Sequence, residues 1–137
     1  MVKVEEILKL LMKHCSFLYS QKKFRFVDSD VSESFGNALL VLEHENLRLR
    51  FVKDRDQIFL DFKPANKKGE KYWFSIDIVK QLVTGRIEDS AELDSEKAVF
   101  LKTNIDEIEQ LFSTTKTEDT IKKLKDLERD RAKVLLP

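Results

Sequence analysis

The feature that most restricts the fold of this chain is a change in hydrophobic periodicity along it. Through residues 1–18, apolar side chains recur every three or four positions, which is typical of an amphipathic helix. Between residues 23 and 62 the period becomes two, as in strands with one buried face, and beyond residue 75 it returns to the helical spacing. We therefore predict an α+β fold, with an N-terminal helix, a four-stranded antiparallel meander and three further helices packed on the sheet.

Four segments are predicted to form the strands of the meander. The first covers residues 23–28 and is followed by a loop over 28–37, where Ser, Asp and Gly favour turns. A continuous apolar run at 38–42 indicates a central strand that is buried on both faces. Alternating patterns at 47–53 and 57–62 predict two half-buried strands.

The last two predicted strands flank residues 54–56 and should form a hairpin. Side chains directly opposite each other share a face of the sheet. Two registers keep the apolar residues of both strands together, and one of these places Arg50 opposite Asp61. A slip by one residue would place Leu49 against Asp61, which the burial of one face disfavours.

The helix that follows the strands has clear end signals. Ser75 stands where an N-cap residue is expected, and Phe74 and Val79 stand where a hydrophobic staple forms. Gly85 suits the left-handed position that ends many helices. These signals predict a helix between Ser75 and Gly85.

Two more helices are predicted in the last third of the chain. Residues 95–113 have helical spacing, with the alternative that 98–101 forms a fifth strand and Asn104 caps a shorter helix. Thr117 is expected to cap a last helix that runs to about residue 134. Its apolar stripe is thin, so residues 116–137 are predicted to be a peripheral helix of the domain.

Length and composition indicate one domain in a reducing compartment. The 137 residues fit a single domain, 1–137, and 25 Lys and Arg residues balance 25 Asp and Glu residues. No net field therefore favours nucleic acid or an acidic membrane as a partner. The single cysteine, Cys15, lies on the first apolar stripe, where we expect a buried, inert thiol. One cysteine makes no internal disulfide and residues 1–18 contain no signal-peptide core, which predicts a cytoplasmic protein.

The residue sets of several well-marked sites are missing. Glycines occur only at positions 36, 69 and 85, which excludes the phosphate-binding loop and the dinucleotide-binding fingerprint. Two histidines, His14 and His44, do not form the zinc-protease motif. Glu43 and Glu45 beside His44 could serve a metal, but a solvated turn is the favoured interpretation because no further ligand stands nearby in sequence. We predict neither a cofactor nor a metal.

Residues 61–63 are the basis of an alternative hypothesis, in which the protein is an enzyme. On a strand, Asp61 and Lys63 point to the same side. An acid that holds Mg²⁺ and a lysine that orients the attacking water, with a second acid nearby, form the arrangement of a metal-dependent nuclease or phosphodiesterase. Arg50 is an available structural partner for Asp61, so the nuclease hypothesis is the alternative to a protein-binding module.

Basic and aromatic residues supply two binding hypotheses. Arg25, Arg48 and Arg50 alternate with aromatic or apolar residues, as in sheets that bind single-stranded nucleic acid, but ordinary half-exposed strands share this pattern. Tyr72 and Trp73 belong to the residue types enriched in protein-binding hot spots. We therefore predict Trp73, Tyr72, Arg48 and Arg50 as residues that bind a protein partner.

Part of the chain resembles a set of small bacterial cytosolic proteins of unknown activity. The resemblance is carried by "LRLRFVKDRDQIFLDF" at 47–62, Trp73 and "IDIVKQLVTG" at 76–85, and "FLKTNIDEIEQLFS" at 100–113 is similar in layout. Some proteins of this size and class are immunity proteins, which neutralise a toxin by binding it. The resemblance implies a binding role and carries over no functional residue.

Together these patterns predict a non-catalytic protein-binding module, of immunity or regulatory type, in a bacterial cytosol. The strand at 38–42 is apolar on both faces, whereas its neighbour carries Arg48 and Arg50 on one of them. Either the last helices cover that face, or an exposed apolar patch marks an interaction site. The expected partner is another protein, with a second copy of this chain as an alternative and no membrane.

Overall fold

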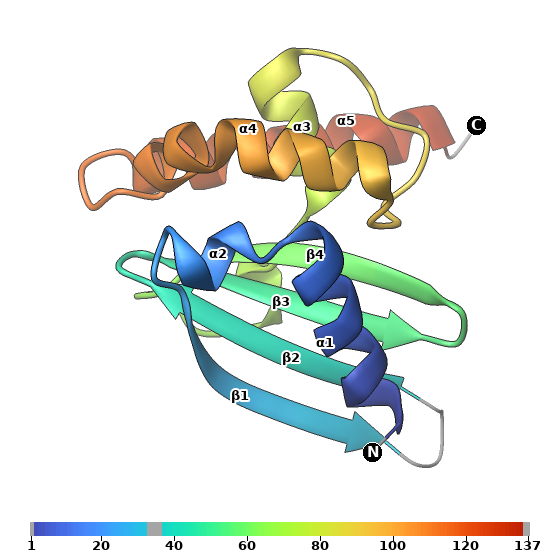
Figure 1. Cartoon of the computed structure of the whole chain (residues 1–137). Helices are drawn as coiled ribbons and strands as arrows, with labels where there is room; N and C mark the ends of the chain where they lie inside the picture. Colours follow the sequence, from blue (N-terminus) through green and yellow to red (C-terminus); the bar gives the residue numbers. More distant parts are fainter. Residues whose placement is uncertain (1, 33–36, 136–137) are drawn as a thin grey trace.

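The computed structural model describes residues 2–32 and 37–135 and has the predicted α+β architecture (Figure 1). Five antiparallel strands form one sheet in the order β1-β2-β3-β4-β5. The strands are β1 (Arg25–Ser32), β2 (Asn37–His44), β3 (Leu47–Asp54), β4 (Gln57–Pro64) and β5 (Phe74–Ser75). The helices are α1 (Val2–His14), α2 (Phe17–Ser20), α3 (Ile76–Thr84), α4 (Ser95–Leu111) and α5 (Thr117–Leu135), with a short 3-10 turn at Glu70–Tyr72.

The hairpin of β3 and β4 has the register that places Arg50 opposite Asp61. Leu49 lies opposite Phe62, and Phe51 lies opposite Leu60, so the apolar side chains of both strands share one face. The prediction from alternation is confirmed, because a shift by one residue would have moved this apolar set to the other face.

The first strand is longer than predicted. The prediction of a loop at 28–37 is wrong for residues 28–32, because β1 continues to Ser32 and pairs with β2. A bulge between Phe26 and Asp28 leaves Val27 as the extra residue. Pairing with an apolar neighbour gives the backbone partners that the local sequence does not suggest. Residues 33–36 of the predicted loop lie outside the described residues.

The fifth strand was not predicted. Phe74 and Ser75 pair with Phe62 and Asp61 at the outer side of β4. A strand of two residues has no alternation to read, so only its tertiary partner identifies it. Phe74 and Val79, the predicted staple residues, are both fully buried.

One face of the sheet carries the main core. In Figure 1, α1 crosses in front of the strands, and α3, α4 and α5 form a group above them. Apolar side chains of all these layers belong to one buried cluster, which includes Leu11 of α1, Leu42 of β2, Phe51 of β3, Leu101 of α4 and Leu124 of α5. This burial supplies most of the driving force for folding.

The N-terminal helix is interrupted. The predicted continuous helix over 1–18 is wrong, because α1 ends at His14 and α2 begins at Phe17. Cys15 lies at this break and is fully buried, as predicted. Burial raises the pKa of the thiol to about 12, which keeps it protonated and unreactive at neutral pH.

The ends of the later helices follow their sequence signals. Gly85 has a φ of 79° and its N–H donates to the Gln81 carbonyl, which confirms the predicted left-handed end. Ser75 occupies the N-cap position of α3, although its side chain makes no capping bond. Residues 98–101 belong to α4, so the strand alternative is wrong. The Asp94 side chain accepts from the Lys97 N–H and caps this helix.

The last helix packs on α3 through the thin stripe seen in the sequence. Ile121 and Leu124 are buried, and Leu127 is partly buried against the core. Arg131 pairs with the buried Asp77 of α3 and donates to the Glu88 carbonyl at 2.8 Å. Among the described helices, none has both the length and the apolar character needed to cross a bilayer.

Candidate functional site

Three regions of the surface bear on function: the charged face of the sheet, its β1 edge, and a pocket at the β2–β3 turn. The charged face is the side opposite the main core and carries Glu43, Arg48, Arg50, Asp61 and Lys63. Strand pairing places Glu43, Arg48 and Lys63 in one cross-strand row and Arg50 and Asp61 in the next. The structure therefore brings together most of the site residues that the sequence singles out.

Asp61 is held by Arg50. Nη2 and Nε of the arginine lie 2.8 and 3.1 Å from the same Asp61 oxygen, and Nη1 reaches Glu70 at 3.0 Å. Burial raises the pKa of Asp61 above its usual value, and the Arg50 guanidinium opposes this rise. The carboxylate predicted to hold a metal is thus engaged in a charge-assisted hydrogen-bond pair.

Lys63 is likewise engaged within the chain. Its ammonium donates to the carbonyls of Pro64 and Lys67, and the side chain is buried. Burial lowers the pKa of Lys63, and the charge of Arg48 lowers it further. Asp61 and Lys63 do lie on one face as expected, but nuclease chemistry would require both to exchange their partners for an ion and a water.

Trp73 covers part of the charged face. The Arg50 guanidinium lies 4.4 Å from its ring centroid and the Lys63 ammonium lies 5.5 Å from it. Tyr72 lies under Lys125 of α5, whose ammonium is 4.9 Å from its ring centroid. These contacts hold both aromatic residues within the fold, and their role in partner binding stays a prediction.

The charged face shows how the second face of the apolar strand β2 is covered. Val41 of β2 points to this face, lies opposite Arg50, and is nevertheless buried. The aliphatic stems of long charged side chains cover apolar surface in this way while their heads form ion pairs. A large apolar patch therefore does not form at Val41.

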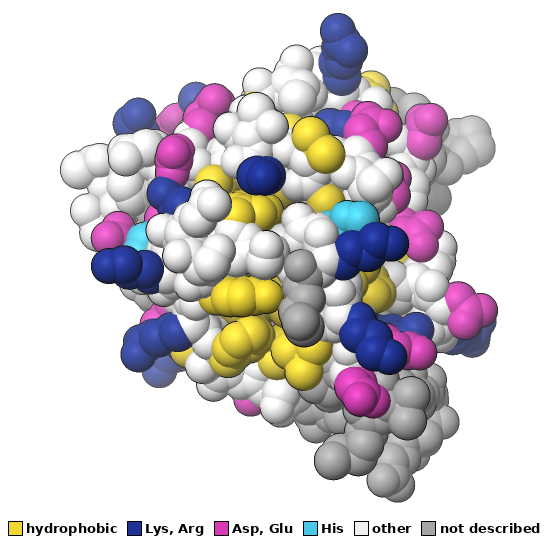
Figure 2. Space-filling view, in the orientation of Figure 1, with side chains coloured by type: hydrophobic (Ala, Val, Ile, Leu, Met, Phe, Trp, Pro, Cys, Tyr) yellow, Lys and Arg dark blue, Asp and Glu magenta, His cyan; other side chains and the backbone are white. Residues whose placement is uncertain are grey.

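An apolar patch does occur beside the β1 edge. It consists of Phe26, which is 49% exposed, Val27, which is 36% exposed, and Leu8 of α1, which is 37% exposed. Tyr19 lies beside Phe26, with ring centroids 6.3 Å apart. Figure 2 shows hydrophobic side chains gathered on the face where α1 crosses the strands. Phe24, two residues before Phe26, is buried, so the exposure is specific to Phe26 of the two rings.

The patch adjoins a strand that has no neighbour on its outer side in the described sheet. β1 is the first strand in the order β1-β2-β3-β4-β5. At the opposite edge, β5 pairs with β4, and the Leu93 N–H donates to the Ile58 carbonyl at 2.7 Å. The outer backbone groups of β1 are therefore the ones that another strand could pair with.

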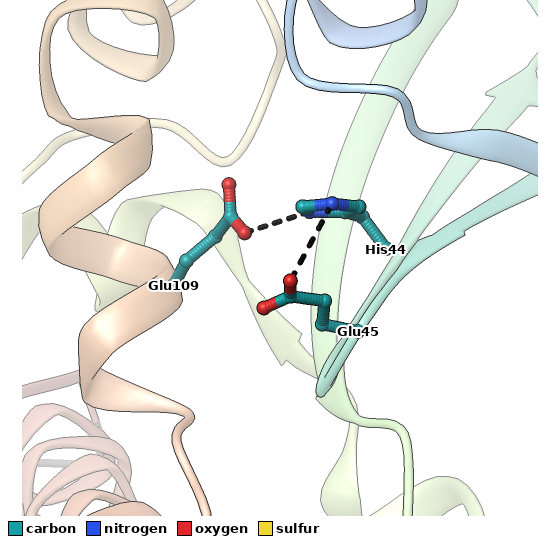
Figure 3. Close-up of side chains that lie close together, drawn as sticks. All are labelled: His44, Glu45 and Glu109. Carbon is teal, nitrogen blue, oxygen red and sulfur yellow. Dashed lines mark hydrogen bonds and ion pairs between the residues drawn. The ribbon is translucent and has the colours of Figure 1, made fainter.

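The pocket lies where the β2–β3 turn meets α4 and has a volume of about 430 Å³. His44 ends β2, Glu45 begins the turn, and Glu109 reaches the imidazole from α4 (Figure 3). The sequence suggested a solvated turn here because Glu109 is 65 positions from His44. Glu109 falls between apolar positions on α4, which by itself gave no signal of a pairing with His44.

Comparison of the chain with protein-family models, with curated proteins and with solved structures finds no match. The functional argument therefore rests on the geometry of these three regions.

Proposed function

We propose that the protein is a non-catalytic protein-binding module that takes up an extended segment of its partner along β1. The single observation that carries the proposal is the coincidence of an open sheet edge with the exposed side chain of Phe26. An added strand would gain main-chain hydrogen bonds from the edge, and its alternate side chains would find the apolar patch.

The amino-acid pattern of the partner segment follows from the apolar side chains that it must cover. Phe26 and Leu8 are exposed apolar side chains on the side of α1, so the segment needs apolar residues at every second position on that side. The bulge at Val27 interrupts the regular edge, so the segment pairs with β1 from Asp28 toward Ser32, and the part of the segment that continues past the bulge contacts Phe26. An immunity or regulatory role in a bacterial cytoplasm is part of this proposal, and the single buried Cys15 supports only its reducing compartment.

The test compares two surface variants in partner capture and hydrogen exchange. Phe26→Lys places a charge in the apolar patch, whereas Ile87→Lys changes a side chain that is 67% exposed in the loop before α4. The tagged proteins are used to capture partners from the lysate of the natural host. We expect one stoichiometric partner that the Ile87 variant retains and the Phe26 variant loses, with new amide protection confined to β1 in the complex.

Several outcomes would overturn the proposal. Equal capture by both variants, or protection outside β1, would place the binding surface elsewhere, with Trp73 as the next residue to test. A dimer of the pure chain that Phe26→Lys dissociates would make a second copy the occupant. Failure to capture any partner would remove the binding hypothesis, and metal-dependent cleavage of DNA or RNA that Asp61→Ala abolishes would favour the nuclease alternative.

A further inference from the structure

The pocket at the β2–β3 turn combines an imidazole with excess negative charge. Four carboxylates line it, from Glu45, Asp106, Glu107 and Glu109, together with one lysine, Lys22. Lys22 is itself paired with Asp106. The remaining carboxylates make this pocket favourable for a cation.

The hydrogen bond between His44 and Glu109 decides which nitrogen carries the proton when the imidazole is neutral. Nδ1 of His44 lies 2.8 Å from Oε2 of Glu109. An ionised carboxylate only accepts hydrogen bonds, so Nδ1 must carry the proton. In the neutral ring, the lone pair is then on Nε2, the nitrogen that binds metal ions when a carboxylate holds the other side.

A second carboxylate lies near Nε2, to one side of the plane of the ring (Figure 3). Figure 3 shows Glu45 and Glu109 on two sides of the imidazole, and Oε1 of Glu45 lies 3.9 Å from Nε2. This separation is too long for a hydrogen bond. Two electron-pair donors this close to each other gain stability when one cation binds both.

We propose that His44 Nε2 and Glu45 bind a divalent transition-metal ion of the Zn²⁺ type, and that Glu109 positions the imidazole. Zinc bonds to both ligand types are about 2.0–2.2 Å long, so a tetrahedral angle needs the two atoms about 3.4 Å apart. The separation must shorten by about half an ångström and the carboxylate must turn toward the plane of the ring. The Glu45 side chain, which is 72% exposed, is free to make this movement. Waters complete the coordination. The imidazole favours Zn²⁺ over Mg²⁺, which prefers oxygen ligands.

A second observation supports the site. The Glu109 side chain is only 14% exposed. Its Oε1 is buried and has no hydrogen-bond partner among the described residues. Lys22 Nζ lies 3.6 Å from this oxygen, beyond hydrogen-bond distance. This contact is an ion pair without a hydrogen bond, so the buried oxygen is only partly stabilised, and a bound cation on the adjacent imidazole would stabilise the carboxylate further.

The other potential metal-binding side chains provide the control. His14 is exposed on α1, and the thiol of its neighbour Cys15 is buried and protonated. His14→Gln therefore removes the only other imidazole without touching the pocket. Because both variants lose one histidine, His14→Gln and His44→Gln form a matched pair.

The test is calorimetric titration of the untagged chain with zinc chloride and, separately, magnesium chloride. We expect saturable binding of one zinc ion per chain, an accompanying rise in thermal midpoint, and far weaker binding of magnesium. His14→Gln should bind as the unmodified chain does, and His44→Gln should lose the saturable site. Glu45→Gln and Glu109→Ala should each weaken zinc binding about 10–100-fold.

The role of Glu109 as a positioning residue has its own readout. Nitrogen NMR of the metal-free chain should report the Nδ1–H tautomer of His44, and Glu109→Ala should shift it toward the Nε2–H form. Circular dichroism of each metal-free variant checks folding, and Glu45→Gln, at an exposed turn, serves if another variant does not fold. Absence of binding at millimolar zinc, or equal binding by His44→Gln and the unmodified chain, would overturn the proposal.

Discussion

The two edges of the sheet differ in how they are closed. The β4 edge is covered by β5, by the bridge between Phe59 and Glu92, and by the hydrogen bond from Leu93. The β1 edge carries a bulge and adjoins the exposed Phe26. Open strand edges favour unwanted association, so proteins cover or distort them. In this molecule one edge is covered by its own chain, and the other is left for a partner in our proposal.

The largest effect should come from the covered edge. Phe74→Ala removes a fully buried ring from a residue that lies opposite Phe62 in the β4–β5 pairing, and should lower the free energy of unfolding by about 3–5 kcal/mol. Phe74→Leu keeps most of the apolar volume and should cost less than about 1.5 kcal/mol. Urea unfolding followed by circular dichroism measures both. A small loss for Phe74→Ala would mean that β5 contributes little to closing this edge.

A middle-sized effect is expected at Trp73, which lies beside the same edge. Trp73→Ala removes the ring that contacts Arg50 and Lys63, and should lower the free energy of unfolding by about 1–3 kcal/mol. Trp73→Phe keeps an aromatic face and should lose less. If urea unfolding shows no change for Trp73→Ala, the fold does not need the ring, and the predicted role of Trp73 in partner binding gains weight.

Asp94 caps α4 directly after the segment that covers β4. Asp94→Ala should cost about 1 kcal/mol at neutral pH, because the N–H of Lys97 loses its acceptor. Burial opposes ionisation, but the hydrogen bonds and charge of Lys97 lower the pKa of Asp94 below its usual value. The stabilisation is therefore present above the unfolded pKa of about 4 and is lost as the pH falls through the lower folded pKa.

Unfolding of Asp94→Ala and the unmodified chain at a series of acidic pH values checks this expectation. The difference between the two should shrink as the carboxyl of the unmodified chain becomes protonated. Asp89→Ala changes an exposed acid in the same loop and serves as the control. A difference that stays constant down to strongly acidic pH would contradict the capping role of the ionised Asp94.

The smallest effect is expected at the open edge. Phe26→Lys should change the free energy of unfolding by no more than about 0.5 kcal/mol, because the side chain already contacts solvent over half of its surface. Urea unfolding of this variant beside Phe74→Ala compares the two edges directly. A loss above about 1 kcal/mol would show that Phe26 belongs to the core and would remove the patch from the binding proposal.

The sequence allowed good prediction where a signal repeats. Alternation along β3 and β4 limited their hairpin to two registers, because one residue of slip exposes every apolar side chain, and the structure has the one with Arg50 opposite Asp61. Gly85 marked the end of α3 because a left-handed residue is needed there. The same local signals explain the wrong loop at 28–32, where Asp and Ser favour turns but β2 supplies a strand partner.

The candidate sites were harder to predict because each depends on contacts between distant segments. The charged face could be expected from the spacing of Asp61 and Lys63. Glu70, which accepts from Arg50, and the Lys67 carbonyl, which accepts from Lys63, come from the following loop and could not. The pocket needed Glu109, whose distance along the chain hides its pairing with His44. The exposure of Phe26 depends on how α1 and α2 pack on the sheet, which the local sequence of β1 does not show.

By itself, the sequence determined the order and type of the main elements, which residues of the central hairpin share a face, and the burial of Cys15. These features follow from local periodicity and from the cost of exposing apolar side chains, which act at every repeat of a pattern. Only the tertiary structure decided which strand edge stays open and which carboxylates meet His44. These two features depend on single contacts between segments that are far apart in the chain, and one contact leaves no repeated pattern in the sequence.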